Sequence, residues 1–294
     1  MKNELASPVQ TSAILKKYGL RAKKRLGQNF LIDKNILHKI VDYANIGRDD
    51  FVLEIGPGIG TMTQLLAQKA AEVAAVEIDD RMVEVMKETL DGYQNVRVIH
   101  GDFLQLDLTE LMRSYKKEGH RKYHIVGNLP YYISTPILWR LIENREQADT
   151  ILIMLQKEVA RRITAEPGGK EYGSLSIAVQ YYMETEILEE ISHNAFLPTP
   201  EVDSALMRLA PRKEPVVKVK DEKLFFELIR CSFAQRRKTI FNNLKNSRVL
   251  GDKDNWDIRM ILTESNIDRQ RRAETISIEE FGILADHAVD LLTN

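Results

Sequence analysis

Cysteine is nearly absent from this sequence, and its scarcity excludes whole classes of protein. The chain of 294 residues contains a single cysteine, Cys231, which rules out an internal disulfide framework. The six histidines are scattered, and none forms a ligand cluster at the spacing of a zinc site. We therefore expect no metal, and we expect a protein of the reducing cytoplasm.

Long apolar segments are missing as well. No run of apolar residues approaches the length that spans a bilayer. The start of the chain is polar and basic, without the apolar stretch of a secretory signal. Neither membrane attachment nor export is therefore expected. The sequence also contains no internal repeat and no low-complexity tract. Nothing in the pattern indicates an obligate oligomer, so we expect a monomer.

The chain also lacks an excess of positive charge. Its 42 lysines and arginines balance 43 aspartates and glutamates, for a formal net charge of -1. This balance counts against a strongly basic nucleic-acid-binding protein. The basic residues are nevertheless clustered at 16–25, 236–238 and 269–272. Each cluster alone is more typical of a solvated helix face, but the local field, rather than the net charge, governs binding to phosphates.

Apolar strands alternate with helices over most of the chain. Candidate strands lie at 51–55, 72–78, 96–100, 123–127, 151–155, 184–191 and 204–210, and candidate helices at 33–45, 61–70, 80–90, 135–144, 157–165 and 174–182. This alternation predicts a mostly parallel sheet covered on both faces. The last two strands lack a crossover helix, which predicts a hairpin at the edge of the sheet. This is the arrangement of the α/β, Rossmann-like class I methyltransferases.

A domain boundary is predicted where Pro211 and Pro215 interrupt the apolar pattern. Beyond it the pattern is helical, over about 221–234, 236–247, 256–264 and 277–292. We expect an N-terminal arm at 1–22, a methyltransferase domain at 23–210 and a small C-terminal α-helical domain at 211–294.

A glycine-rich loop follows the first strand of the predicted sheet. Gly56, Gly58 and Gly60 form a G-x-G-x-G pattern, and Glu54 precedes it. A dinucleotide-binding loop has G-x-G-x-x-G spacing, and a pyrophosphate prefers a bare helix N-terminus. A glycine-rich backbone can approach a ligand closely. With an acidic side chain beside it, such a loop instead favours a cationic ligand, the sulfonium of S-adenosylmethionine.

Acidic residues end the next two candidate strands. Glu77 can accept hydrogen bonds from both ribose hydroxyls, and Asp102 from an adenine amino group, with Phe103 packing on the ring. Taken singly, Glu77 can equally be an ordinary strand-end carboxylate and Asp102 a helix N-cap. Ligand positions at three successive strand ends together favour S-adenosylmethionine as the cofactor.

The motif Asn128-Leu129-Pro130-Tyr131 follows the fourth candidate strand and faces the same crevice. An exocyclic amino group on adenine is a poor nucleophile, because its lone pair is delocalised into the ring. The Asn128 side-chain oxygen and the Leu129 carbonyl can accept its hydrogen bonds and aim the lone pair at a methyl group. Pro130 fixes the turn, and Tyr131 offers a face for stacking. Alone, such a motif is more typical of a turn that ends a strand; downstream of the glycine loop it predicts adenine N6 methylation.

These motifs resemble the ribosomal RNA adenine N6,N6-dimethyltransferases, and among them the small-subunit enzymes. The resemblance covers residues from about 23 to 281. The segments that carry it are 23–31, the glycine loop, Glu77, 101–102, 128–131, 156–160, 196–205 and 233–244.

The resemblance implies further site residues. Asn29 and Leu31 would contact the methionine end of the cofactor, with Gln28 beside them, and Phe196 would form the second aromatic face of the base pocket. From the residues alone, Gln28 and Asn29 are a polar pair and Phe196 a core residue. The implied rRNA contacts are basic residues in two segments: Lys23, Lys24, Arg25, Arg236, Arg237 and Lys238.

The resemblance also implies a substrate: two adjacent adenosines in a hairpin loop near the 3′ end of 16S rRNA, in an immature 30S subunit. Single-stranded loop bases can be splayed into a pocket. One alternative is a 23S rRNA adenine methyltransferase of the macrolide-resistance type; Leu129 and the cluster at 236–238 favour the small subunit. Another is a ribosome-assembly factor whose binding outweighs its catalysis. A DNA adenine methyltransferase is disfavoured by Leu129 and by the lack of a recognisable DNA-reading module.

Overall fold

A seven-stranded sheet organises the first of two units that the chain forms in this computed structural model. The structure describes residues 5, 7–20, 28–115, 120–247, 249–250 and 255–293. The sheet unit consists of Met1–Ala160 and Glu186–Pro211, and the helical unit of Arg161–Thr185 and Arg212–Asn294.

The sheet has the strand order β4-β3-β2-β5-β6-β9-β7. Its strands are β2 (Phe51–Ile55), β3 (Glu72–Glu77), β4 (Val96–His100), β5 (Tyr123–Asn128), β6 (Thr150–Gln156), β7 (Met183–Ile191) and β9 (Ser204–Pro211). The pairs from β4 to β6 are parallel, whereas β9 runs antiparallel to β6. The predicted edge hairpin is therefore present, with its second strand inserted between β6 and β7.

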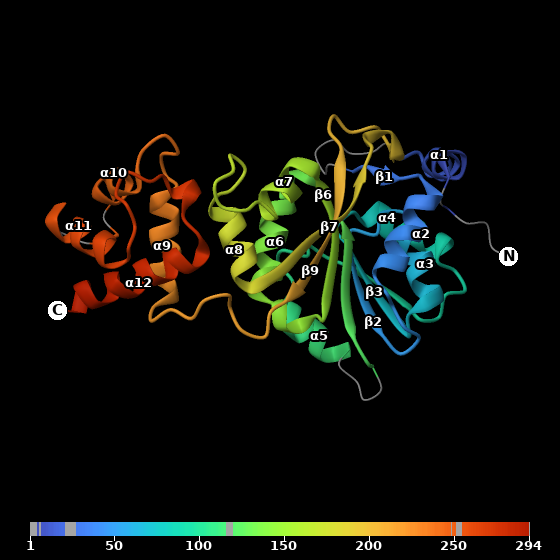
Figure 1. Ribbon diagram of the computed structural model, residues 1–294. Coiled ribbons are helices and arrows are strands. Elements are labelled where there is room, and N and C mark those ends of the chain that lie inside the picture. The colour runs from blue at the N-terminus through green and yellow to red at the C-terminus, as the bar shows by residue number, and fades with distance from the viewer. Residues whose placement is uncertain are drawn as a thin grey trace. The chain divides into compact units, whose positions relative to one another are not determined.

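Helices cover both faces of this sheet, as Figure 1 shows. On one side lie α2 (Lys34–Tyr43), α3 (Thr61–Lys69) and α4 (Asp80–Thr89), and on the other α5 (Leu108–Tyr115) and α6 (Ser134–Glu143). The apolar faces of α2 and α3 pack on strand residues such as Val52, Val73 and Val126. Because β2 is buried along its whole length, the carboxyl ends of the parallel strands are held rigidly at one edge.

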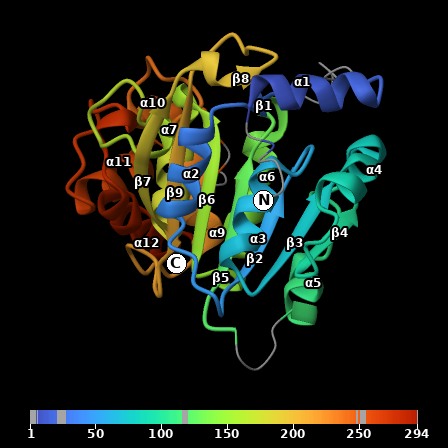
Figure 2. The same ribbon diagram turned by 90° about the vertical axis from the view of Figure 1, so that its right-hand side faces the viewer.

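A second, two-stranded sheet lies above that edge. It pairs β1 (Phe30–Leu31) with β8 (Phe196–Leu197) in antiparallel register. The N-terminal helix α1 (Pro8–Lys17) packs beside it through Leu15, and both views place α1 next to β1 (Figure 2). Segments that are far apart in the chain therefore meet over the edge of the main sheet.

The helical unit has a core of its own. It contains α8 (Ser174–Tyr182), α9 (Glu222–Ser232), α10 (Ile240–Lys245), α11 (Asn255–Glu264) and α12 (Ile278–Thr293), while α7 (Lys157–Ile163) links it to the sheet unit. The rings of Tyr181 on α8 and Phe225 on α9 lie 5.0 Å apart within this core. Residues 161–185, which the sequence pattern grouped with the sheet, thus pack with the helices because α8 contributes Ile177 and Tyr181 to their core.

Two sequence expectations need correction at the level of elements. The basic cluster at 236–238 was expected to begin a helix, but it lies in a turn, and α10 begins only at Ile240 with Thr239 as its N-cap. Helix α5 was not expected at all. In the described part of the chain, every helix is too short or too polar to span a bilayer.

Candidate functional site

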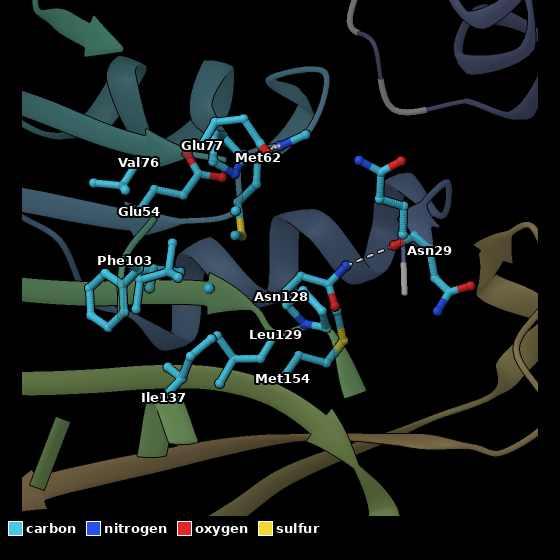
Figure 3. Close-up of a pocket in the computed structure, with 18 of the residues that line it drawn as sticks. Asn29, Glu54, Met62, Val76, Glu77, Phe103, Asn128, Leu129, Ile137 and Met154 are labelled. Carbon is cyan, nitrogen blue, oxygen red and sulfur yellow. Dashed lines mark hydrogen bonds between the residues drawn. The ribbon is translucent and has the colours of Figure 1, made fainter. Parts of the chain in front are cut away.

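A pocket opens at the carboxyl edge of the main sheet, where the loops after β2, β3, β4 and β5 converge (Figure 3). The residues that line it belong to the segment before α2, the glycine loop, the ends of the strands and the motif after β5. They include Gln28, Asn29, Leu31, Glu54, Gly56, Gly58, Glu77, Asp102, Phe103, Asn128, Leu129, Pro130 and Tyr131. All of the predicted cofactor residues therefore converge on one cavity.

The glycine loop approaches this pocket so closely that a side chain would not fit. Gly58 has a φ of +59°, a left-handed conformation that favours glycine, and a Cβ there would lie 3.1 Å from the Phe30 ring. The Gly58 N–H donates to Glu77 Oε2 at 3.0 Å. The loop is thus fixed against the end of β3, and it leaves its backbone open to a ligand.

Glu77 is held by backbone donors rather than by a basic side chain. Besides the bond from Gly58, its Oε1 accepts the Asp79 N–H at 2.9 Å. Burial raises the pKa of this carboxyl, and the hydrogen bonds from Asp79 and Gly58 oppose that shift. A carboxylate fixed in this way retains lone pairs that can accept from a pair of hydroxyls.

Glu54 is the most unusual group in the pocket. It lies on β2, its side chain is fully buried, and no well-formed hydrogen bond reaches either carboxylate oxygen from the described residues, although the nearby Thr63 side chain acts to lower its pKa. Burial raises its pKa to about 8, and the nearby Glu77 carboxylate acts in the same direction. Burial of a carboxyl group without a well-formed hydrogen bond costs free energy of folding unless a cation or a hydrogen-bond donor pairs with it. This cavity therefore fits a positively charged ligand, and S-adenosylmethionine carries a sulfonium and an ammonium group.

Asp102 ends the loop after β4 and caps the turn that follows. Its Oδ1 accepts the Leu104 N–H at 2.9 Å, and its Oδ2 accepts Gln105 Nε2 at 3.0 Å. The sequence allowed Asp102 to be a helix N-cap; instead it caps a turn, and the next helix, α5, begins only at Leu108. The carboxylate also lines the pocket beside Phe103, so a ligand role is compatible with it.

The N-terminal segment orients Asn128. Its Nδ2 donates to the Asn29 carbonyl at 3.0 Å, a bond that Figure 3 marks across the pocket. Because a carbonyl can only accept, the NH2 of the side chain must face Asn29. The Asn128 oxygen then points away from Asn29, with capacity to accept a hydrogen bond from another group. Gln28 is anchored nearby, through a 3.0 Å bond from its Nε2 to Asp79.

The rest of the motif is fixed by the neighbouring strands. The Leu129 N–H donates to the Met154 carbonyl on β6 at 3.0 Å. Pro130 begins the short 3-10 helix η2 (Tyr131–Ile133), which places the half-buried Tyr131 ring at the pocket. The Tyr131 hydroxyl lies 2.6 Å from Ser204 Oγ on β9.

The structure does not bring Phe196 to this cavity. Its side chain is only 1% exposed, lies in the core with Leu37 and Ile40, and is absent from the pocket lining. Its role as the second face of a base pocket stays a prediction. The core position, which the residues alone favoured, is the one observed.

The predicted RNA-binding residues fall in two groups. Lys23, Lys24 and Arg25 lie outside the described residues. Arg236, Arg237 and Lys238 are exposed in the turn before α10, where Arg236 bonds to the Lys170 carbonyl and lies 3.6 Å from Glu274. The Arg236 side chain is therefore engaged in contacts within the helical unit.

Sequence reasoning missed two residues of this site. Phe30 packs against the glycine loop, and Ser204 reaches the Tyr131 hydroxyl from a strand far along the chain. Both residues lie in segments that carry the family resemblance, but neither contact could be assigned from the sequence because both depend on the tertiary fold. Within the described ranges, no group of three or more histidine, cysteine or acidic side chains is placed to hold a metal ion.

The strand order, the glycine loop and the acidic strand ends define a Rossmann-like methyltransferase of class I. The family model of ribosomal RNA adenine dimethylase matches residues 19–283. The chain therefore belongs to the ribosomal RNA adenine dimethylase family, and its cofactor is S-adenosylmethionine.

Known proteins similar to this chain fall into the same group. A ribosomal RNA small subunit methyltransferase A of Geobacillus sp. strain WCH70 is 49% identical over 97% of this chain and 98% of its own length. The protein of that name from Bacillus mycoides is 50% identical over 96% of this chain and 97% of its own.

Two solved structures share the fold. A dimethyladenosine transferase from Plasmodium falciparum is 26% identical with a TM-score of 0.72, covering 86% of this chain and 94% of its own. The 23S rRNA methyltransferase ErmE is 27% identical with a TM-score of 0.66, covering 89% of this chain and all of its own length (100%).

Proposed function

We propose that this enzyme transfers methyl groups from S-adenosylmethionine to N6 of two adjacent adenosines in a hairpin loop near the 3′ end of 16S rRNA. The products are N6,N6-dimethyladenosines. The observation that carries the proposal is the orientation of Asn128: its Nδ2 is bonded to the Asn29 carbonyl, so its side-chain oxygen stays an acceptor on a residue that lines the same pocket as the glycine loop and Glu77. Relatives about half identical over nearly the full length, with names that specify the small subunit, support the choice of substrate.

The residues supply orientation and electrostatics. When bound, S-adenosylmethionine offers a methyl group whose bond to sulfur breaks as a bond to N6 forms, with the bonding electron pair left on sulfur. Asn128 Oδ1 and the Leu129 carbonyl accept the N6 hydrogens, so the nitrogen becomes tetrahedral with its lone pair aimed at the methyl group. The Tyr131 ring stacks on the base, with Phe196 as its partner face if the segment around β8 rearranges.

The strand ends would hold the cofactor. Glu77 would accept from its ribose hydroxyls and Asp102 from its adenine amino group, while Gly56 and Gly58 would allow the backbone to approach. Gln28, Asn29 and Leu31 would contact the methionine end. Glu54 would balance the positive charge that this end of the cofactor carries.

The partner we propose is an immature 30S subunit in the cytoplasm, bound by a monomer. Arg236, Arg237 and Lys238 contact rRNA phosphates, together with Lys23, Lys24 and Arg25. Because the enzyme must recognise an incomplete subunit, we also propose a late role in 30S biogenesis. An Asn128→Ala strain separates the two roles: a strain that lacks methylation but assembles 30S normally would contradict a dependence of assembly on catalysis.

The alternative substrate is 23S rRNA, because the fold is shared with ErmE. One experiment decides between them. Labelled cofactor is supplied with the enzyme to unmethylated 30S and to 50S particles, and the products are mapped by nuclease digestion. We expect label in a single 30S hairpin loop. Label confined to the large subunit would overturn the proposal.

A further inference from the structure

Ser204 makes a contact with the catalytic motif that the reaction scheme above does not use. Its Oγ lies 2.6 Å from the Tyr131 hydroxyl, and its side chain is 0% exposed. Ser204 is absent from the pocket lining, whereas Tyr131 lines it. Any effect of Ser204 on the reaction must therefore act through the Tyr131 ring.

The position of Ser204 is fixed by the sheet. It opposes Gln156 in the antiparallel pairing of β6 with β9. The residue before it, Asp203, accepts the Lys157 N–H through its carbonyl at 3.0 Å and the His193 N–H through its side chain at 3.1 Å. Leu206, two residues further along β9, lines the pocket, as expected for side chains on one face of a strand.

Tyr131 is consequently held at both ends. Ser134 Oγ donates to its backbone carbonyl at 3.1 Å, and Ser204 binds its hydroxyl. These two contacts fix the position and the long axis of the ring, and the preference of a phenolic oxygen for hydrogen bonds in the plane of its own ring restricts rotation about that axis. A base stacked on that ring takes its own plane from it.

The two successive methyl transfers place different demands on this ring. Each transfer forms one N6–carbon bond, breaks one sulfur–carbon bond and releases one N6 hydrogen to solvent as a proton. The unmodified amino group offers two N–H donors to Asn128 and Leu129, but the monomethylated group offers one. The second transfer therefore loses one orienting hydrogen bond and depends more on stacking.

Resting on the proposed function, we propose that Ser204 is a positioning residue for dimethylation: by fixing the Tyr131 ring it aligns the monomethylated adenine for the second transfer. Removal of its hydroxyl slows the second methyl transfer more than the first. The variant enzyme then releases or retains substrate carrying a single methyl group.

The test measures both products on 30S particles that lack the modification. Full-length wild type, Ser204→Ala, Tyr131→Phe and the double variant are compared, with nucleosides quantified by mass spectrometry over a time course. Ser265→Ala is the matched control, because it removes another buried serine hydroxyl, one bonded within the helical unit to the Ile261 carbonyl at 2.6 Å. Affinity for S-adenosylmethionine is measured for each protein.

We expect the ratio of monomethyl to dimethyladenosine to rise roughly threefold to tenfold in Ser204→Ala, as for the loss of one hydrogen bond. Tyr131→Phe, which keeps the ring, should show the same rise, and the double variant no more than either single variant. Ser265→Ala and the cofactor affinities should match wild type.

Two results would overturn the inference: a wild-type product ratio in both single variants, or effects that add in the double variant. If wild type itself leaves the 30S particles unmethylated, the proposed function fails instead. The two failures are therefore distinguishable in one experiment.

Discussion

At the scale of single residues, the proposed mechanism assigns the cofactor and the substrate to different groups of the site. Glu77 is tied to the backbone of the glycine loop, whereas Asn128 is tied to the carbonyl of Asn29. The two side chains thus lie on different strands and bond to different segments. Substitutions at the two positions should therefore affect different kinetic constants.

The first prediction contrasts these two residues. Glu77→Ala should weaken binding of S-adenosylmethionine by about tenfold to a hundredfold, because hydrogen bonds to a charged group are worth about 1.5–3 kcal/mol. Asn128→Ala should lower kcat by about a hundredfold or more, because its acceptor acts mainly in the transition state. Calorimetry with the cofactor and single-turnover methylation measure the two effects. Equal cofactor affinity in wild type and Glu77→Ala would refute the ribose assignment.

A second prediction concerns pH and Glu54. Burial raises the pKa of this carboxyl from the ordinary 4.5 to about 8, so the folded, cofactor-free protein holds a proton that the unfolded chain releases. The contribution of Glu54 to stability should therefore fall as pH rises through this window. A cationic cofactor favours the ionised form, so its binding should release a proton and tighten toward pH 8, by at most about tenfold per pH unit.

Calorimetry in buffers of different ionisation enthalpy detects this proton release. Glu54→Gln, a neutral group of the same shape, is the control and should remove this contribution to the pH dependence of both stability and affinity. If the stability and the cofactor affinity of wild type and Glu54→Gln change identically with pH, the ionisation of Glu54 is not coupled to binding of the cationic cofactor.

At the scale of elements, the strands and most helices could be predicted from local pattern. Helix α8 occupies the predicted residues, and most sheet strands lie within a residue or two of expectation. Helix α5 was predictable: Asp107 caps it, and Leu108, Met112 and Tyr115 form a buried face. The β1–β8 ladder was not, because two-residue strands carry no periodicity and their pairing joins distant segments.

In the candidate site, too, features set by local pattern could be predicted, whereas contacts between distant segments could not. The glycine loop, Glu77, Asp102 and Asn128 were predictable because each follows a strand and parallel strands end at one edge. The burial of Phe196 and the bond from Ser204 to Tyr131 arise from packing between distant segments. The turn at 236–238 was mistaken for helix because its charged residues are good helix formers, whereas Thr239 caps a helix that begins later.

A third prediction follows from the close approach of β2 and β5. A Cβ at Gly127 would lie 3.0 Å from the Ile55 carbonyl oxygen and 3.1 Å from the Leu129 side chain. Gly127→Ala should separate the strands, displace the adjacent Asn128 and cost about 1–3 kcal/mol of stability. Denaturant unfolding measures the loss. Gly173→Ala is the control, since nothing lies within 4 Å of a Cβ there. A fully stable, fully active Gly127→Ala would contradict the packing described here.

At the scale of the whole molecule, near-neutral net charge and RNA binding are reconciled by local clusters. The chain carries a formal net charge of -1, yet Arg236, Arg237 and Lys238 are adjacent and exposed in the helical unit. Arg236 is partly committed to Lys170 and Glu274. Arg237 and Lys238 are therefore the better candidates for phosphate contacts that leave the fold unchanged.

The fourth prediction tests this distinction. Replacing Arg237 and Lys238 by alanine should weaken binding to 30S particles and reduce the slope of log affinity against log salt by about 0.7–0.9 per lost phosphate contact. Cofactor affinity and thermal stability should stay at wild-type values. Lys213→Ala, an exposed lysine elsewhere in the same unit, serves as the control. An unchanged salt slope would place the RNA contacts elsewhere.

The bond between Tyr131 and Ser204 also has a consequence for the order of events during synthesis. The two residues are separated by 73 positions. A nascent chain that has emerged through Tyr131 already contains the glycine loop, Glu77 and Asn128, but it lacks the strand that fixes the ring. Translation thus supplies the residues proposed to hold the methyl donor before it supplies the strand that supports Tyr131.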